Sequence, residues 1–260
     1  MTRTRASGAT GESQAWLATY LDASKKPLTI LAFLLPLVVA YEIGLAFALR
    51  SSEGVLTNKA HVTLLRFFDT FGISAGGGLY LGGAVLVVVL LVWHLLTRDP
   101  WRLEPATPGV MAVESLIVTI PLIVLAQVIL RNSAGSQPMP ATPVVDPTAL
   151  GSLTIWSKLA ISIGAGLYEE LMFRMLLIAV LHTLLVDVGK LNSTLGAIIA
   201  IVVSASAFTI YHPQAADFDS GMFYFVAGLY FGGVYVVRGF GIVVGVHAIY
   251  DIIMVSMLPS

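Results

Sequence analysis

Long apolar runs, separated by short polar segments, occupy most of this chain. They fall at about 28–49, 75–97, 109–130, 154–187, 195–212, 219–238 and 241–258. Most of them are close to the length of about 20 residues that an α-helix needs to cross a lipid bilayer. The pattern predicts an all-α, polytopic transmembrane helical bundle with about seven spans, and eight spans are the alternative.

The run at 154–187 is much longer than one crossing requires. We expect either one long tilted helix or a helix that is broken near Gly164-Ala165-Gly166. An extra span inside this run would change the span count.

The polar segments between the runs predict the remaining organisation. Residues 1–27 are expected to form a polar N-terminal tail that precedes a retained first span, and residues 28–150 hold the N-terminal transmembrane spans. Val62–Phe68 could form an amphipathic helix at the membrane interface. The proline-rich residues 132–152 are expected to form a loop.

The composition agrees with a membrane protein and excludes several chemistries. Hydrophobic residues make up 57% of the chain and charged residues only 11%, so the composition is far from that of a soluble domain. The net charge of −1 suggests neither nucleic acid nor an acidic partner. Because the chain has no cysteine, disulfides, Cys-ligated metals and thiol catalysis are excluded. We predict an integral, multi-pass membrane protein, placed in the cytoplasmic membrane if the source is bacterial, with the lipid bilayer as its partner.

A cluster of charged residues interrupts the long run at 154–187. Glu169-Glu170-Leu171-Met172-Phe173-Arg174 lies between the apolar stretches 159–168 and 175–186. Burial of one Asp, Lys or Arg at bilayer depth costs roughly 2.5–3.5 kcal/mol on insertion scales. We therefore interpret the cluster as a candidate functional site.

Helical geometry divides this cluster into two parts. Glu170 and Arg174 are one turn apart on nearly the same face, where their pairing would reduce the cost of burying both. Glu169 points away from this pair, and the small residues Ala165 and Gly166 lie one turn before it. We therefore expect Glu170 and Arg174 to form a structural ion pair, and Glu169 to be the candidate base.

Two further polar groups lie on apolar helices. His212 ends the run at 195–212, and Phe208 lies one turn before it. His247 and Asp251 share one face of the last run. Either histidine alone could be a hydrogen-bonded packing residue, but together with Glu169 these groups are the side chains that activate water. We interpret all of them as parts of one site.

Taken in order, these residues resemble the signature motifs of a known family. Glu169-Glu170-x-x-x-Arg174, Phe208-x-x-x-His212 and His247-x-x-x-Asp251 look like the three motifs of the CPBP intramembrane proteases. That family contains the type II CAAX prenyl endopeptidases and the bacterial Abi and bacteriocin-processing homologues. The resemblance covers about 154–258, and it implies that residues 151–260 form a CAAX-protease-like catalytic core in the C-terminal half of the chain.

The resemblance also implies an activity. The expected enzyme is an intramembrane endopeptidase that hydrolyses a peptide bond of a membrane-associated substrate, with a prenylated CAAX-type chain as one option. By this resemblance Glu169 and His212 activate the attacking water, while His247 and Asp251 stabilise the oxyanion.

The same resemblance gives supporting roles to the other motif residues. Glu170 and Arg174 would hold the polar face of their helix in place, and Phe208 would position His212.

Two features of this site have alternative interpretations. Many family members carry Asn where this chain has Asp251, and an ionised Asp251 cannot donate a hydrogen bond to an oxyanion. It would have to be protonated or else orient His247 through its ring N–H. Glu169, His212 and His247 could also bind a divalent metal such as zinc, with water in the fourth position, or the site could work without a metal.

Two other classes of function compete with the protease. A non-proteolytic membrane scaffold or immunity protein could keep the fold, but the presence of Glu169, His212 and His247 argues against it. A small-solute transporter would also bury carboxylates in the membrane. Here the polar residues gather in the C-terminal half, which counts against a transporter.

Several isolated polar residues are expected to have packing roles. Glu42, His94 and Glu114 should each make one interhelical hydrogen bond, and Glu114 is the strongest candidate among them to join the site. His61 and His182 look like interfacial residues.

Overall fold

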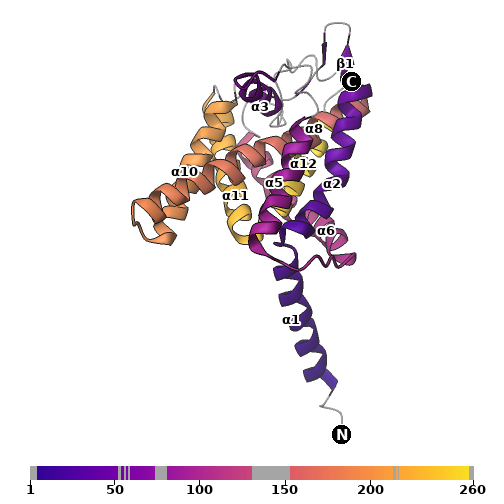
Figure 1. Cartoon of the computed structure of the whole chain (residues 1–260), viewed down its shortest axis with the longest axis vertical. Helices are drawn as coiled ribbons and strands as arrows, with labels where there is room; N and C mark the ends of the chain where they lie inside the picture. The colour runs from indigo at the N-terminus through magenta and orange to yellow at the C-terminus, as the bar shows by residue number, and fades with distance from the viewer. Residues whose placement is uncertain are drawn as a thin grey trace.

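The apolar runs fold into helices, and the computed structural model is a helical bundle with one short β-hairpin among its described residues (Figure 1). The structure describes residues 5–51, 54, 55, 57, 59–73, 81–130, 153–212, 215 and 217–257. The predicted all-α, polytopic class is confirmed. The predicted loop at 132–152 lies outside the described residues.

The elements follow the order of the predicted runs. The α-helices are α1 (Arg5–Ala23), α2 (Pro27–Ile43), α3 (Lys59–Asp69), α5 (Leu81–Thr97), α6 (Ala106–Leu130), α8 (Ile155–Glu170), α9 (Ala179–His182), α10 (Ser193–Tyr211), α11 (Phe218–Arg238) and α12 (Phe240–Ser256). Three π-helical segments continue them: η1 (Gly44–Ala48), η2 (Leu171–Ile178) and η3 (Thr183–Val188). The hairpin pairs β1 (Arg50–Ser51) with β2 (Gly54–Val55) in antiparallel register.

Five of the described helical segments are long and apolar enough to cross a membrane. They are Pro27–Ala48, Ala106–Ile129, Ile155–Val188, Ser193–Tyr211 and Phe218–Arg238. Two shorter apolar helices, Leu81–Thr97 and Phe240–Ser256, occupy the positions of the other two predicted runs. An integral, multi-pass membrane protein is therefore confirmed, while the count of seven spans stays a prediction.

The long run at 154–187 forms one uninterrupted helical segment of 34 residues, Ile155–Val188. The alternative of a break near Gly164-Ala165-Gly166 is wrong, because α8 passes through these residues without interruption. The small side chains serve packing instead. A Cβ atom on Gly166 would lie 2.8 Å from the backbone nitrogen of Ala248, so glycine allows α8 and α12 to approach closely.

Local sequence signals mark where the helices of the C-terminal half begin. The side chains of Thr154, Asn192 and Asp217 accept hydrogen bonds from the first turns of α8, α10 and α11. The hydrogen bonds from Ser220 lower the pKa of the Asp217 carboxyl. Gly239, at φ 92°, makes the sharp turn between α11 and α12, a conformation that favours glycine.

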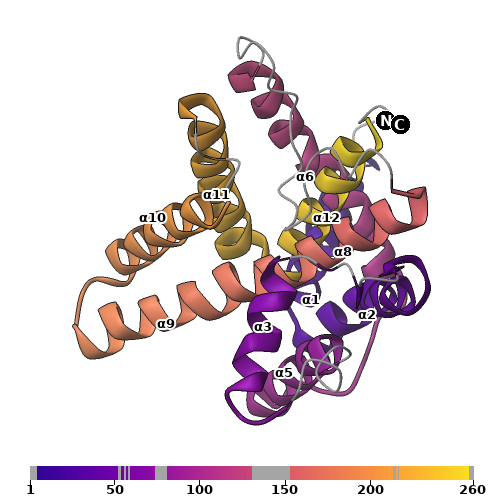
Figure 2. The same ribbon diagram turned by 90° about the horizontal axis from the view of Figure 1, so that it is seen from above.

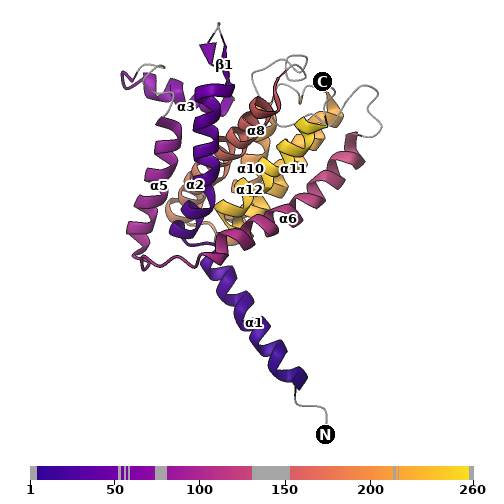
Figure 3. The same cartoon turned by 90° about the vertical axis from the view of Figure 1, so that its right-hand side faces the viewer.

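Helix α12 lies inside the bundle and is buried along nearly its whole length (Figure 3). It packs mainly against α8 and α6, while α10 packs against α11 (Figure 2). The predicted tail at 1–27 is helical from Arg5, and α1 extends away from the bundle (Figures 1 and 3). The predicted amphipathic segment Val62–Phe68 lies within α3 and is helical.

Candidate active site

Three parts of the fold bring the polar motif residues together inside the bundle. Glu169 and Glu170 end α8, Arg174 lies in η2, His212 follows α10, and His247 and Asp251 lie on α12. All six are buried: His212 is 5% exposed, Glu169 is 1% exposed, and the other four have no exposed surface. Charged groups this deep require partners within the protein, so the contacts between them define the site.

The close approach of α8 and α12 explains how the motif residues of these two helices come into contact. Gly166 allows the backbone of Ala248 to contact α8, and Ala248 directly follows His247. The His247 ring therefore reaches both carboxylates that end α8. The site is thus assembled where α8 and α12 pack against each other.

Glu170 is the central acceptor of the site. Its Oε1 accepts a hydrogen bond of 2.9 Å from Nη1 of Arg174, which confirms the predicted ion pair. The same oxygen lies 2.6 Å from Nδ1 of His247. Because a carboxylate bound by a guanidinium is ionised and can only accept, Nδ1 of His247 carries the proton. Glu170 therefore orients His247. The sequence predicted only the ion pair of Glu170 with Arg174, not this second contact.

Glu169 faces both histidines through one oxygen. Its Oε2 lies 3.4 Å from Nε2 of His212 and 3.8 Å from Nε2 of His247. Within the described part of the chain, this oxygen makes no hydrogen bond. The predicted separation of Glu169 from the Glu170–Arg174 pair is confirmed.

His212 is held by its backbone and by aromatic neighbours. Its Nδ1 lies 2.7 Å from the carbonyl oxygen of Phe208, which can only accept, so Nδ1 donates and Nε2 faces Glu169. The His212 ring stacks on Tyr224, with ring centroids 4.6 Å apart and planes 12° apart. These contacts determine both the tautomer and the direction of the ring.

His247 lies between an aromatic ring and a second carboxylate. Its ring stacks on Phe231, with centroids 4.7 Å apart, and its Nε2 is 3.6 Å from Oδ2 of Asp251. Asp251 thus faces the same nitrogen that faces Glu169. Tyr224 and Phe231 were not singled out from the sequence, although their spacing of seven residues places both on one face of α11.

Phe208 fills the space between the charged groups. Its buried ring lies 4.4 Å from the guanidinium carbon of Arg174, 4.4 Å from the His212 ring and 6.1 Å from the His247 ring. The guanidinium also lies 5.0 Å from the Phe231 ring centroid. Arg174 is therefore held by cation–π contacts as well as by its ion pair.

The other polar candidates lie outside this site. Glu114 does not join it, because its carboxylate accepts hydrogen bonds from Arg238 and Tyr20. Glu42 accepts the expected interhelical bond, from the backbone N–H of Gly83.

The histidines outside the motifs also differ from expectation. The ring of His61, which was predicted to be interfacial, is fully buried and bonded to Tyr41 and Thr57. His94 packs edge-on against Trp101, and its ring nitrogens make no hydrogen bond within the described residues, so the expected interhelical bond is absent there. His182 is half-buried and lies 3.4 Å from the hydroxyl of Ser193.

Metal binding was the other option for Glu169, His212 and His247. Among the residues that the structure describes, no group of three or more His, Asp or Glu side chains is arranged to hold a metal ion. We derive no step of the chemistry through a metal.

Comparison with known proteins agrees with the family resemblance. Residues 151–253 match the model of a family described as type II CAAX prenyl endopeptidase Rce1-like. No curated protein and no solved structure matches the chain. The match contains all seven predicted site residues, and the resemblance to the CPBP proteases is confirmed over this segment.

Proposed function

We propose that this protein is an intramembrane endopeptidase. The premise is the match of residues 151–253 to the Rce1-like family of type II CAAX prenyl endopeptidases. The observation that carries the proposal is the 3.4 Å approach of Glu169 Oε2 to His212 Nε2, in a buried site that also contains His247. These two groups would activate a water molecule for attack on a peptide carbonyl.

The hydrogen-bond pattern of His212 supports this role. With its proton on Nδ1, the neutral ring presents a lone pair on Nε2 toward a carboxylate that is also an acceptor. One water can bridge two such acceptors by donating an O–H to each, at about 2.8 Å. Such a water keeps both lone pairs free, as a nucleophile requires.

The peptide bond would then be cleaved by general acid–base catalysis. The water oxygen attacks the scissile carbonyl carbon while its proton passes to Glu169. The same proton then goes to the leaving amide nitrogen as the C–N bond breaks, which returns Glu169 to its ionised form. His212 orients the water by accepting its other O–H at Nε2.

His247 is the proposed donor to the oxyanion. Because its Nδ1 donates to Glu170, its Nε2 can donate only if the ring is an imidazolium. Glu170 and Asp251 flank this ring, and their negative charges favour that form. Asp251 would thus act as an ionised neighbour whose charge stabilises the His247 imidazolium, so it need not contact the oxyanion itself.

The remaining motif residues would support this arrangement. Arg174 compensates the charge of Glu170 and thereby keeps Glu170 ionised for His247. Phe208 separates the Arg174 guanidinium from the His212 and His247 rings and sets their spacing. The substrate would be a membrane-associated chain, and a prenylated CAAX-type chain is the specific class that we propose.

The direct test is quantitative proteomics of membrane fractions from three strains: wild type, deletion, and Glu169→Ala. We expect the same uncleaved membrane protein to accumulate in the deletion and Glu169→Ala strains. A scaffold or immunity protein would instead keep its function in Glu169→Ala. Processing that is unchanged in both Glu169→Ala and His212→Ala would overturn the proposal.

Two measurements on the purified protein complete this test. Cleavage of a farnesylated peptide that ends in a CAAX sequence decides whether prenylated chains are substrates. Metal analysis of the same active sample determines whether a metal accompanies the activity.

A further inference from the structure

Helix α3 lies against the two elements that carry Glu169 and His212. His61 stacks on Tyr168, with ring centroids 4.8 Å apart and planes 15° apart. Two residues earlier on α3, Nζ of Lys59 donates a hydrogen bond to the backbone carbonyl oxygen of Tyr211. Tyr168 directly precedes Glu169, and Tyr211 directly precedes His212. One helix outside the three sequence motifs therefore contacts the chain next to both members of the proposed water-activating pair.

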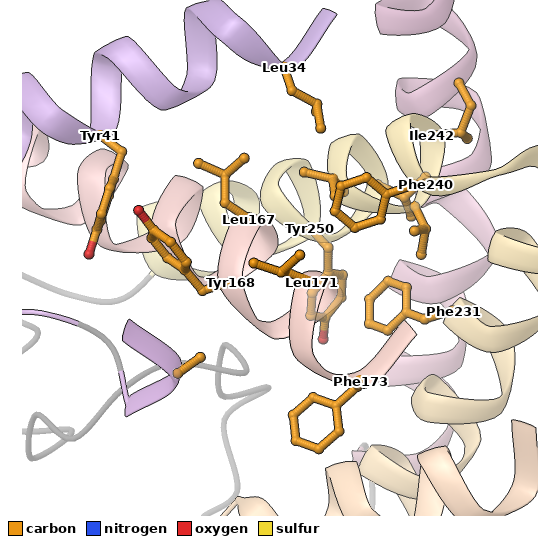
Figure 4. Close-up of a cluster of buried hydrophobic side chains, with 14 of the residues drawn as sticks. Leu34, Tyr41, Leu167, Tyr168, Leu171, Phe173, Phe231, Phe240, Ile242 and Tyr250 are labelled. Atoms are coloured by element: carbon orange, nitrogen blue, oxygen red, sulfur yellow. The ribbon is translucent and has the colours of Figure 1, made fainter. Parts of the chain in front are cut away.

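The contact on the Tyr168 side is anchored deep in the protein. The buried His61 ring lies 2.7 Å from the hydroxyl of Tyr41 and 2.8 Å from that of Thr57 through its Nδ1. Tyr41 in turn packs edge-on against Tyr168, with ring centroids 5.2 Å apart, and Figure 4 shows these two rings next to each other. Tyr168 is thus enclosed by α2 and α3 together, so its position depends on both.

The contact on the Tyr211 side has three parts. Besides its hydrogen bond to the carbonyl oxygen, Nζ of Lys59 lies 4.0 Å from the centroid of the Tyr211 ring. The hydroxyl of Thr63 lies 3.1 Å from the Tyr211 hydroxyl. The last carbonyls of a helix have no partner within the helix and attract cations, so a lysine at the end of α10 stabilises that end. His212 follows this end directly.

We propose that Lys59, His61 and Thr63 are positioning residues that hold Glu169 and His212 at the separation their shared water requires. The three side chains hold the tyrosine before each catalytic residue and so join the end of α8 to the end of α10. The proposal rests on the water-activating roles of Glu169 and His212. A misplacement of about 1 Å can lower a rate roughly 100-fold, so such residues can control catalysis without contacting the substrate.

The test uses Lys59→Met, which removes the donor, and Lys59→Arg, which keeps a cationic donor. Lys190→Met is the matched control, since Nζ of Lys190 also bonds to a backbone carbonyl, that of Asp187, but in an exposed turn. Thr63→Val is a second, milder variant that removes one exposed hydroxyl without a change of charge. Each protein is purified in detergent, and its unfolding temperature is measured first, so that only folded samples are compared.

The first measurement does not depend on activity. Nitrogen-15 spectra of histidine-labelled protein report on the His212 ring, whose signals are assigned from a His212→Gln sample. We expect the His212 signals to move in Lys59→Met and, by less, in Thr63→Val. They should stay in place in Lys59→Arg and Lys190→Met. Unmoved His212 signals in folded Lys59→Met and Thr63→Val would overturn the proposal.

The second measurement is cleavage of the farnesylated CAAX peptide. We expect kcat to fall roughly tenfold or more in Lys59→Met while KM stays within about twofold, and Lys59→Arg to recover kcat. A rise of kcat in Lys59→Met would overturn the proposal, because it would mean that α3 obstructs the site. If wild type leaves this peptide intact while the His212 signals still move, the substrate assignment fails and the positioning role stands.

Discussion

Nδ1 of His247 lies 2.6 Å from Oε1 of Glu170, across 77 residues of sequence. The same oxygen binds Arg174, so the ion pair on one helix orients the histidine of another. This contact determines which nitrogen of His247 carries its proton, and it leaves Nε2 directed toward Glu169 and Asp251.

Replacement of Glu170 should therefore reduce both stability and activity. Glu170→Gln leaves Arg174 as a fully buried cation without a counter-charge, which typically costs about 3–5 kcal/mol. We expect a lower unfolding temperature and almost no cleavage. The double variant Glu170→Gln/Arg174→Met should recover much of the stability but none of the activity, since His247 still lacks its carboxylate. A double variant that regains activity would contradict the orienting role of Glu170.

Loss of the proposed base should remove activity without unfolding the protein. Glu169 Oε2 makes no hydrogen bond within the described residues, so Glu169→Gln removes a base but no essential structural bond. We expect the cleavage rate to fall by roughly 100- to 10,000-fold with an unfolding temperature near that of wild type. His182→Gln, on a half-buried histidine outside the site, is the control and should retain full activity. Wild-type rates in Glu169→Gln would exclude it as the base.

Two substitutions at Asp251 separate its possible roles. Asp251→Asn keeps the shape and leaves an amide oxygen beside Nε2 of His247, so we expect it to retain activity within about tenfold of wild type. Asp251→Ala removes the partner altogether and should lose far more. Equal activity of both variants would mean that Asp251 does not act through His247. The measurement is the initial rate of peptide cleavage at saturating substrate.

Glu114 should matter for stability and not for catalysis. It joins α1, α6 and α11, because its carboxylate accepts from Tyr20 and from Arg238 at 2.8 Å. Glu114→Gln should lower the free energy of unfolding by about 1–3 kcal/mol, and kcat of the folded fraction should be unchanged. A fall in kcat at constant stability would return Glu114 to the list of catalytic candidates.

The same cluster predicts a change of stability at alkaline pH. Burial, together with the hydrogen bond to Glu114, raises the pKa of the Tyr20 hydroxyl above its ordinary value of 10.0. The unfolded chain therefore releases this proton first as the pH rises, and the stabilisation by Tyr20 is present below pH 10 and is lost above it. Unfolding temperatures measured from pH 8 to pH 11 should fall less steeply in Tyr20→Phe than in wild type. Parallel curves for the two proteins would contradict this.

The helical class and the site motifs could be predicted because they depend on local signals. Apolar runs of membrane-spanning length predict helices, and spacing of four residues places Glu170 near Arg174 and His247 near Asp251 on one helix face. Contacts between helices carry no such local signal. The sequence therefore left open whether Gly164–Gly166 break the helix, since the same small residues can either interrupt a helix or admit a neighbour.

His61 shows the same limit more clearly. The sequence suggested an interfacial residue, and the fold buries its ring against Tyr41 and Tyr168. The sequence by itself determined a membrane-embedded helical bundle and which side chains are available for chemistry, because hydropathy and helical periodicity act within one segment. Only the tertiary structure decided that Glu170 orients His247 and that α3 contacts both Tyr168 at the end of α8 and Tyr211 at the end of α10. Those relationships depend on how closely the helices pack, and residues far apart in the chain determine that packing.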